Sequence, residues 1–310
     1  MQPKRSLWLG APLALGLACA GPPLREPEAP ACAPDSAGVP LAYELHAPDG
    51  SRAFLQGSMH FVRGGPPALH PRVEAGLRDA EVLVLEIDPD ESKPEDISRA
   101  LLEMAMLPEG TKLRDVVSAD TWQLLETRAA QSKADLASLE IFEPWVVALT
   151  LIVGSITQVG FEAQAGTEQV ALASSLDKQT LGLETPREQL ALFDALSPED
   201  QEEMLRGALE GDPSGMSHLD AIADAWRCGD AAGVEAALQM ERHANPRLAA
   251  FYDATIYGRN PGMAEGIAEI VQEQVGVFVV VGAAHLVGSR GIPALLEQAG
   301  FRVEPMRKQP

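Results

Sequence analysis

The stretch VFVVVGAAH, residues 277–285, indicates the fold of this chain most directly. Its first five residues are all apolar and lack polar alternation, which is typical of a strand buried on both faces of a parallel sheet. His285 follows after a short Gly-Ala-Ala turn. In open α/β sheets ligands bind beyond the carboxyl ends of the strands, so we expect His285 to face such a site.

Three further segments place a polar side chain at the end of an apolar strand. FLQGSMH ends in His60, VLVLEID carries Glu86 and Asp88, and TLGLET carries Glu184. Parallel strands end at one edge of a sheet, so these side chains should converge there with His285. Two imidazoles and two or more carboxylates suit a divalent metal. The alternative for either histidine is an ordinary hydrogen-bonded structural residue.

Glycine precedes both histidines by three residues, in GSMH (57–60) and GAAH (282–285). Gly57 and Gly282 allow sharp turns and a close approach of the backbone to a ligand. A third match, GMSH at 215–218, lies in a polar loop without a preceding strand, and we interpret it as coincidence. Glu184 also has an alternative role, because a helix start at Thr185-Pro186 follows it and the carboxylate could simply fix that turn.

The remaining pattern predicts an α/β fold: a central, largely parallel sheet covered by helices, with a large helical insertion in the second half. Strands are expected at 53–57, 82–87, 179–183, 277–281 and 301–304. Helices are expected at 71–80 and 292–299, and from Pro186 and Pro198 through mostly helical sequence to about residue 274. We interpret residues 40–310 as a single domain.

The first 20 residues have the features of an export signal: two basic residues, an apolar core and the small-residue end Ala18-Cys19-Ala20. Ordinary cleavage after Ala20 and lipidation of Cys19, as in bacterial lipoproteins, are both compatible with this sequence. Gly16 stands where lipoprotein signals usually have Leu. We expect an exported protein, periplasmic or extracellular, whose only membrane contact would be a lipid on Cys19.

Export also affects how the cysteines are interpreted, because disulfides persist outside the cytoplasm. Of the 3 cysteines, Cys32 and Cys228 remain once Cys19 is removed or lipidated. Two alternatives are open: a bridge between them, or two unpaired thiols. Cys32 lies in a Pro/Ala-rich segment, residues 21–39, which we interpret as an extended linker because it has no hydrophobic periodicity.

Composition and motifs exclude several function classes. With 24 basic against 45 acidic residues, the net charge of −21 offers no attraction for a phosphate backbone, so no nucleic-acid partner is expected. The longest internal apolar run, residues 145–156, is about half the length of a membrane-spanning helix. The motifs H-E-x-x-H, G-x-S-x-G and the P-loop are absent, which argues against zinc-helix proteases, serine hydrolases and nucleotide-driven enzymes.

The order of the motifs resembles the TraB/GumN family, which includes the Tiki-type metalloproteases. The resemblance spans roughly residues 41–303 and is carried by GSMH, LVLEID, GFE, LGLET, GRN and VVVGAAHLVGSRGIPALLEQAGFRV. The paired family motifs correspond to the two G-x-x-H turns, the acidic strand-end residue to Glu86, and the Arg-Asn pair to Arg259 and Asn260. Bacterial members often have Asp where this chain has Glu162, so a carboxylate of different reach is retained.

This resemblance implies a metal-dependent hydrolase, and Tiki-type members cleave peptide bonds with a divalent metal. We interpret His60 and His285 as neutral ligands of Mn, Co or Zn, with Glu162 or Glu86 as the third ligand. The remaining carboxylate would accept a proton from water, and Arg259, with Asn260 beside it, would stabilise the developing oxyanion. For Arg259 the alternative is an ordinary ion pair.

The second function class is a protein that sequesters a peptide or saccharide in the same pocket without cleaving it. An acidic surface is compatible with both classes, because it keeps an exported protein soluble and favours cationic ligands. The family resemblance does not carry a substrate with it, so the peptide or saccharide is unspecified.

Overall fold

The computed structural model describes residues 32, 39–62, 68–87, 94–132, 135–158, 161–163, 171, 178–211, 217–244 and 249–307. The chain forms two compact units. The helical unit lies within Ser92–Phe161 and Pro186–Met216, and the sheet unit within Glu26–Glu91, Glu162–Thr185 and Ser217–Pro310. The predicted signal and most of the predicted linker lie outside the described residues.

The described part of the helical unit contains the helices α2 (Pro94–Ala105), α3 (Leu113–Val116), α4 (Ala119–Ser132), α5 (Leu136–Leu139), α6 (Pro144–Gln158), α8 (Pro186–Asp194) and α9 (Pro198–Glu210). Helices α8 and α9 begin at the predicted prolines, and Ser197 caps α9 by accepting the Asp200 N–H at 3.1 Å. The helices from α2 to α6 were not assigned from the sequence. Trp145 of α6 is buried and stacks on Phe193 of α8.

The strands and helices of the sheet unit are β1 (Ala42–His46), β2 (Arg52–Ser58), β3 (Phe61–Val62), α1 (Pro71–Asp79), β4 (Val82–Ile87), β5 (Glu162–Ala163), β6 (Gln179–Glu184), α10 (Ser217–Cys228), α11 (Ala231–Ala244), α12 (Ala249–Tyr252), a π-helix (Asp253–Tyr257), α13 (Asn260–Glu273), β7 (Val277–Gly282), a 3₁₀ turn (Ala283–Leu286), α14 (Ile292–Gln298) and β8 (Arg302–Pro305). Each of the five predicted strands is present, with ends shifted by at most one residue.

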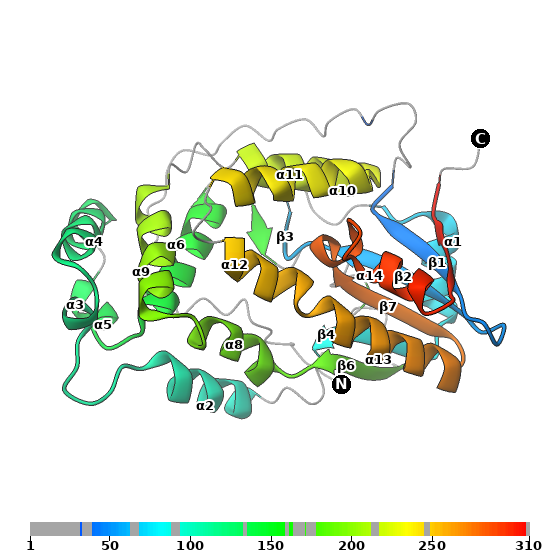
Figure 1. The fold of residues 1–310 in the computed structure, drawn as a ribbon, viewed down its shortest axis with the longest axis horizontal. Helices are drawn as coiled ribbons and strands as arrows, with labels where there is room; N and C mark the ends of the chain where they lie inside the picture. The colour runs from blue at the N-terminus through cyan, green and yellow to red at the C-terminus, as the bar shows by residue number, and fades with distance from the viewer. Residues whose placement is uncertain are drawn as a thin grey trace, which may run out of the picture. The chain divides into compact units, whose positions relative to one another are not determined.

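Six strands form one sheet in the order β6-β4-β7-β2-β1-β8 (Figure 1). β6, β4, β7 and β2 are parallel, whereas β1 is antiparallel to both β2 and β8. The predicted largely parallel sheet covered by helices is therefore confirmed. β1 was not predicted, because Glu44 and His46 interrupt its apolar residues and remove the signal of a buried strand.

Helices bury the sheet on both faces. Leu83 packs with Leu77 of α1 on one face, and Val279 packs with Ile267 of α13 on the other. Neighbouring residues of a strand point to opposite faces, so apolar runs such as VLVLEI and VFVVV serve both layers. Each fully buried aliphatic side chain stabilises the fold by about 1.5–3 kcal/mol.

A disulfide joins Cys32 to Cys228 at the end of α10. The structure thus has the bridged form of the two alternatives left open by the sequence. Two residues before Cys228, the Trp226 carbonyl accepts the Leu41 N–H at 3.0 Å, next to the start of β1. The bridge therefore fastens the chain near residue 32 close to the point where the sheet begins.

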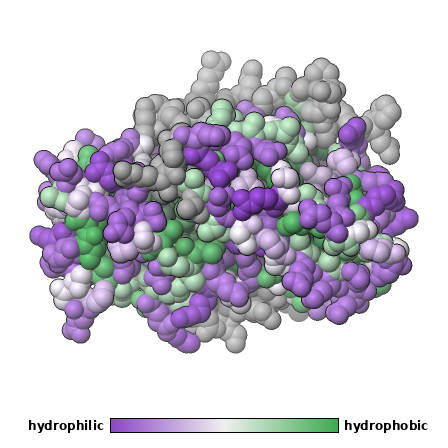
Figure 2. Space-filling model, viewed as in Figure 1, coloured by the Kyte–Doolittle hydropathy of each residue, from purple (hydrophilic) through white to green (hydrophobic). Residues whose placement is uncertain are grey.

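The face of the molecule drawn in Figure 2 carries many polar side chains. Figure 2 shows hydrophilic residues spread over the face in view, with smaller apolar areas between them. Among the described residues, no helix is long and apolar enough to cross a membrane.

Removing the disulfide should destabilise the sheet unit. The bridge spans 196 residues, and the loss of chain entropy that it imposes on the unfolded state corresponds to about 5 kcal/mol at most. We expect the Cys32→Ser/Cys228→Ser double variant to unfold at a lower urea concentration than the oxidised wild type. Unfolding is measured by tryptophan fluorescence. Reductant should lower the urea concentration at which the wild type unfolds to that of the variant, and it should not change the unfolding of the variant. Equal stability of the variant and the oxidised wild type would contradict this role.

Candidate active site

The register of the sheet brings the predicted strand ends to one edge. β2 pairs with β7 so that Ser58 lies opposite Gly282, and β4 pairs with β6 so that Ile87 lies opposite Glu184. β7 lies between β2 and β4 in the sheet. The carboxyl ends of all four strands, which carry or precede the predicted site residues, are therefore neighbours within the sheet unit.

Arg259, at the start of α13, joins the carboxylates of two strands. Its Nε donates to both Glu184 oxygens at 2.9 and 3.1 Å, and its Nη2 donates to Glu86 Oε2 at 2.8 Å and also to Glu184. The side chains of Glu86, Glu184 and Arg259 are 12, 16 and 13% exposed. One guanidinium offsets only one of two negative charges, so this group still favours a nearby cation.

The other terminal nitrogen of Arg259 is also engaged. Nη1 donates to the Thr255 carbonyl at 3.0 Å and lies 3.3 Å from His285 Nε2. Together with the bonds to the two carboxylates, these contacts use the N–H groups that a guanidinium has to offer. Arg259 therefore orients the two carboxylates and His285.

His285 is held in one orientation by Asn260. His285 Nδ1 lies 2.6 Å from Asn260 Oδ1, and Asn260 Nδ2 donates to the Arg290 carbonyl at 2.7 Å. The second contact places the amide oxygen towards the imidazole, so His285 Nδ1 carries the proton and Nε2 is the acceptor. Asn260, predicted among the catalytic residues, is fully buried, at 0% exposure, and contacts the His285 imidazole. Its catalytic role stays a prediction.

Burial and neighbouring charges control the protonation of Glu86 and His285. Burial alone would raise the pKa of Glu86 above its usual 4.5. The charges of His285, Arg259 and His60 and the hydrogen bond from the Gly282 N–H outweigh this effect and lower the pKa to about 2. For His285, by contrast, burial lowers the pKa, because it disfavours the charged imidazolium. The imidazole is therefore neutral at neutral pH. At neutral pH, where His285 is uncharged, Arg259 and the Gly282 N–H still stabilise the ionised Glu86 carboxylate.

The two motif glycines permit close approaches that a side chain would block. A Cβ on Gly282 would lie 3.1 Å from Glu86 Oε1, the oxygen that accepts the Gly282 N–H at 2.6 Å. A Cβ on Gly57 would lie 3.1 Å from the Leu41 carbonyl oxygen and 3.4 Å from Ala283 Cα. Gly57 therefore lets the two histidine-bearing turns pack together, and Gly282 lets the carboxylate reach the backbone.

His60 is exposed just beyond β2, and its charge contributes to the low pKa of Glu86. The turn before His60 is anchored from a distant part of the chain. The indole N–H of Trp226, a fully buried residue of α10, donates to the Gly57 carbonyl at 3.0 Å. Sequence reasoning missed this anchor because 169 residues separate its two partners.

The third predicted metal ligand is placed only by its backbone. Glu162 lies in β5, which pairs with β3 so that Glu162 is opposite Val62, two residues beyond His60. The side chain of Glu162 and the whole of Asp88 lie outside the described residues. The ligand roles of His60, His285 and Glu162 stay predictions.

A different donor group was not predicted from the sequence. Glu44, His46 and Glu304 each offer one ligand atom, and these atoms lie within 4.8 Å of one another, so the group could hold a metal ion. Within the described part of the chain, no other set of three such residues meets this spacing. The alternating Glu44 and His46 were the available sequence signal, but their closeness to Glu304 depends on pairing between the two ends of the domain.

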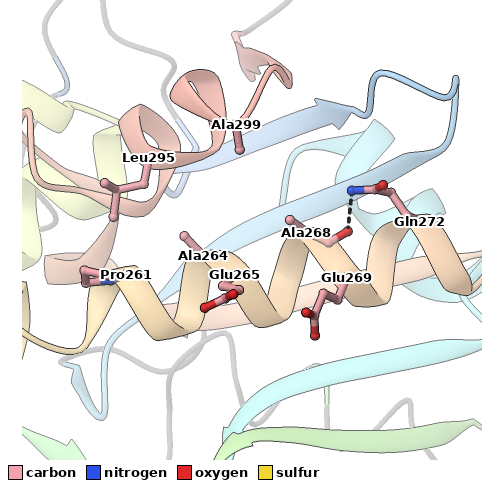
Figure 3. A pocket seen from close by; sticks show the side chains of 8 residues that line it. All are labelled: Pro261, Ala264, Glu265, Ala268, Glu269, Gln272, Leu295 and Ala299. Atoms are coloured by element: carbon pink, nitrogen blue, oxygen red, sulfur yellow. Dashed lines mark hydrogen bonds between the residues drawn. The ribbon is translucent and has the colours of Figure 1, made fainter.

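A groove of about 340 Å³ between α13 and α14 lies elsewhere in the sheet unit (Figure 3). Ala264 and Ala268 of α13, Leu295 of α14 and Ala299, which follows α14, line it. The predicted site residues are not among its lining residues, so the groove is separate from the candidate active site.

The TraB/PrgY/gumN family profile matches residues 42–305. The chain belongs to this family. The match includes both G-x-x-H turns, the strand-end carboxylates and the Arg259-Asn260 pair, so the predicted TraB/GumN membership is confirmed. A search of curated proteins and a search of solved structures each find no match.

The tautomer of His285 in this TraB-family chain is directly testable. We expect nitrogen-15 NMR of the imidazole to show the proton on Nδ1 in the wild type, because Asn260 Oδ1 accepts from it. Asn260→Leu should allow the Nε2-protonated tautomer to appear. Asn260→Asp is the matched variant, since it keeps an acceptor oxygen and should retain the proton on Nδ1. A wild-type imidazole protonated on Nε2 alone would contradict the arrangement.

The low pKa of Glu86 predicts a pH-dependent contribution to stability. Its pKa is lower in the folded than in the unfolded chain, so the stabilisation is complete above about pH 5 and disappears as the pH falls towards 2. The shift corresponds to about 3 kcal/mol. Urea unfolding at several pH values should therefore show the stability difference between wild type and Glu86→Gln narrowing over this range. Glu269→Gln, at an exposed position of α13, controls for net charge, and a pH-independent difference for Glu86→Gln would refute the prediction.

Proposed function

We propose that this TraB-family protein is an exported, metal-dependent hydrolase, most simply a peptidase. The observation that carries the proposal is the meeting of His285 Nε2 with the Glu86 and Glu184 carboxylates around Arg259 at one sheet edge. Family membership supports the same class.

The imidazole nitrogens and carboxylate oxygens at this edge are donor types that bind divalent metals. Asn260 leaves His285 Nε2 as an acceptor, which is the state that a metal ligand requires. His60, beyond the neighbouring strand, would supply a second imidazole, and Glu86 or Glu162 a carboxylate. When bound, Mn, Co or Zn supplies Lewis acidity that polarises a carbonyl group and makes water a stronger nucleophile at neutral pH.

The protonation states favour particular roles for the carboxylates. A general base works best when its pKa lies near the working pH, and Glu86, with a pKa of about 2, is a weak base. We assign Glu86 to ligation and to anchoring Arg259, and Glu162 to accepting the proton from water. The Arg259 Nη1 N–H, which now faces His285, would donate to the substrate oxyanion once Nε2 has another partner.

We also propose that the protein works outside the cytoplasm, in the periplasm or beyond the cell. The Cys32–Cys228 disulfide supports this location, because such bridges persist in oxidising compartments. The predicted export signal of residues 1–20 points the same way, and lipidation of Cys19 is the alternative to release in soluble form.

Metal reconstitution tests the proposed activity. The oxidised mature chain is freed of metal with a chelator, reloaded with Mn²⁺, Co²⁺ or Zn²⁺, and incubated with a peptide mixture that is analysed by mass spectrometry. We expect cleavage only after reloading, and His60→Ala and His285→Ala should each lower the rate more than about 100-fold, because they remove ligands rather than outer contacts. His243→Ala, at an exposed position of α11, is the matched control and should retain the wild-type rate.

The outcomes separate the two function classes. Metal-dependent cleavage that survives both substitutions would refute the proposed site. Saturable binding of a peptide or saccharide that needs both histidines, without any turnover, would instead identify the sequestering protein of the second class.

A further inference from the structure

A second donor group lies at the opposite end of the sheet. Glu44 and His46 belong to β1, and Glu304 belongs to the edge strand β8. Glu44 pairs with Glu304, while His46 pairs with Arg302 on one side and with Arg52, the first residue of β2, on the other. β2 has 7 residues and His60 follows its far end, so about 20 Å of strand separates the two regions.

The three side chains share one face of the sheet, because residues two apart on a strand point the same way. His46 Nε2 lies 3.8 Å from Glu44 Oε1 and 3.5 Å from Glu304 Oε2. Ligands bonded to a tetrahedral zinc ion at about 2.0–2.2 Å are about 3.3–3.6 Å apart. The spacing of this group is therefore close to that of three zinc ligands before any rearrangement.

The second oxygen of each carboxylate is already held by an arginine. Arg72 of α1 donates to Glu44 Oε2, and Arg302 donates to Glu304 Oε1. Each carboxylate thus turns one oxygen to an arginine and the other to His46. Ligating carboxylates in metal sites are commonly oriented by such outer hydrogen bonds, so the arginines need not be displaced.

His46 gives an independent indication of a missing partner. Its side chain is only 13% exposed, and Nε2 is a buried atom without a hydrogen-bond partner among the described residues. Leaving a buried polar atom without a partner is unfavourable. One oxygen of each carboxylate lies within 4 Å of Nε2, so a cation bound among them would satisfy all three atoms at once.

We propose that Glu44, His46 and Glu304 bind a Zn²⁺ ion that fastens β8 to β1. One imidazole nitrogen and two carboxylate oxygens suit zinc better than Mg²⁺ or Ca²⁺, which favour oxygen ligands alone. Glu304 is 47% exposed, so water can complete the coordination from that side. The role is structural, because β8 is a short strand at the edge of the described sheet, where its strand pairing is with β1.

Zinc titration of the full mature chain tests this site. After chelator treatment, equilibrium dialysis should show one fewer zinc bound by His46→Gln and by Glu304→Gln than by the wild type. Zinc should also raise the melting temperature of the wild type, since free zinc at 100 times Kd increases the folding equilibrium constant about 100-fold. Glu297→Gln, an exposed carboxylate of α14, is the matched control and should keep both properties.

A His60→Ala/His285→Ala variant distinguishes this site from the proposed active site. It should lose metal-dependent hydrolysis and keep the zinc-dependent rise in melting temperature. The proposal is overturned if zinc stabilises His46→Gln as much as the wild type, or if stabilisation depends on His60 and His285 alone. It is also overturned if His46 stabilises the chain only at acid pH without binding zinc, which would identify an ion triad of His46 with the two glutamates.

Discussion

The arrangement of the candidate active site depends on the bonds from Arg259 to Glu86 and Glu184. These bonds connect the start of α13 to the ends of β4 and β6, and the three charged side chains are all largely buried. Buried carboxylates without a partner are strongly unfavourable, so the guanidinium is needed before the two strand ends can lie this close together. The same bonds hold Glu86 ionised, which couples the packing of the sheet edge to its chemistry.

Several neutral contacts then fix the orientation of the histidines. Asn260 determines which imidazole nitrogen of His285 is an acceptor, and Trp226 anchors the turn that leads to His60. Gly57 and Gly282 contribute through the absence of a side chain, which allows the two turns and the Glu86 carboxylate to approach. The candidate site residues are therefore held in place by buried partners, which is the arrangement that a preorganised site requires.

The reversed direction of β1 divides the sheet into two chemically different ends. The parallel strands deliver the family residues to their carboxyl edge, whereas β1 and β8 gather Glu44, His46 and Glu304 at the other end. At the carboxyl edge, Arg259 lies between the carboxylates and donates to both. At the other end, arginines donate to the carboxylate oxygens that face away from His46. This difference in where the positive charges lie is consistent with a reactive site at one end and a structural ion at the other.

Local sequence predicted five of the strands, the capped start of α9 and the identity of the residues at the strand ends, because strand patterns and capping depend on a few neighbouring residues. It also indicated the family, since the motifs and their order are properties of the sequence. β1, the Trp226 anchor, the tautomer of His285 and the Glu44-His46-Glu304 group were decided only by tertiary structure. Each joins residues far apart in the chain, and such contacts depend on the packing of complete strands and helices, which no local pattern records.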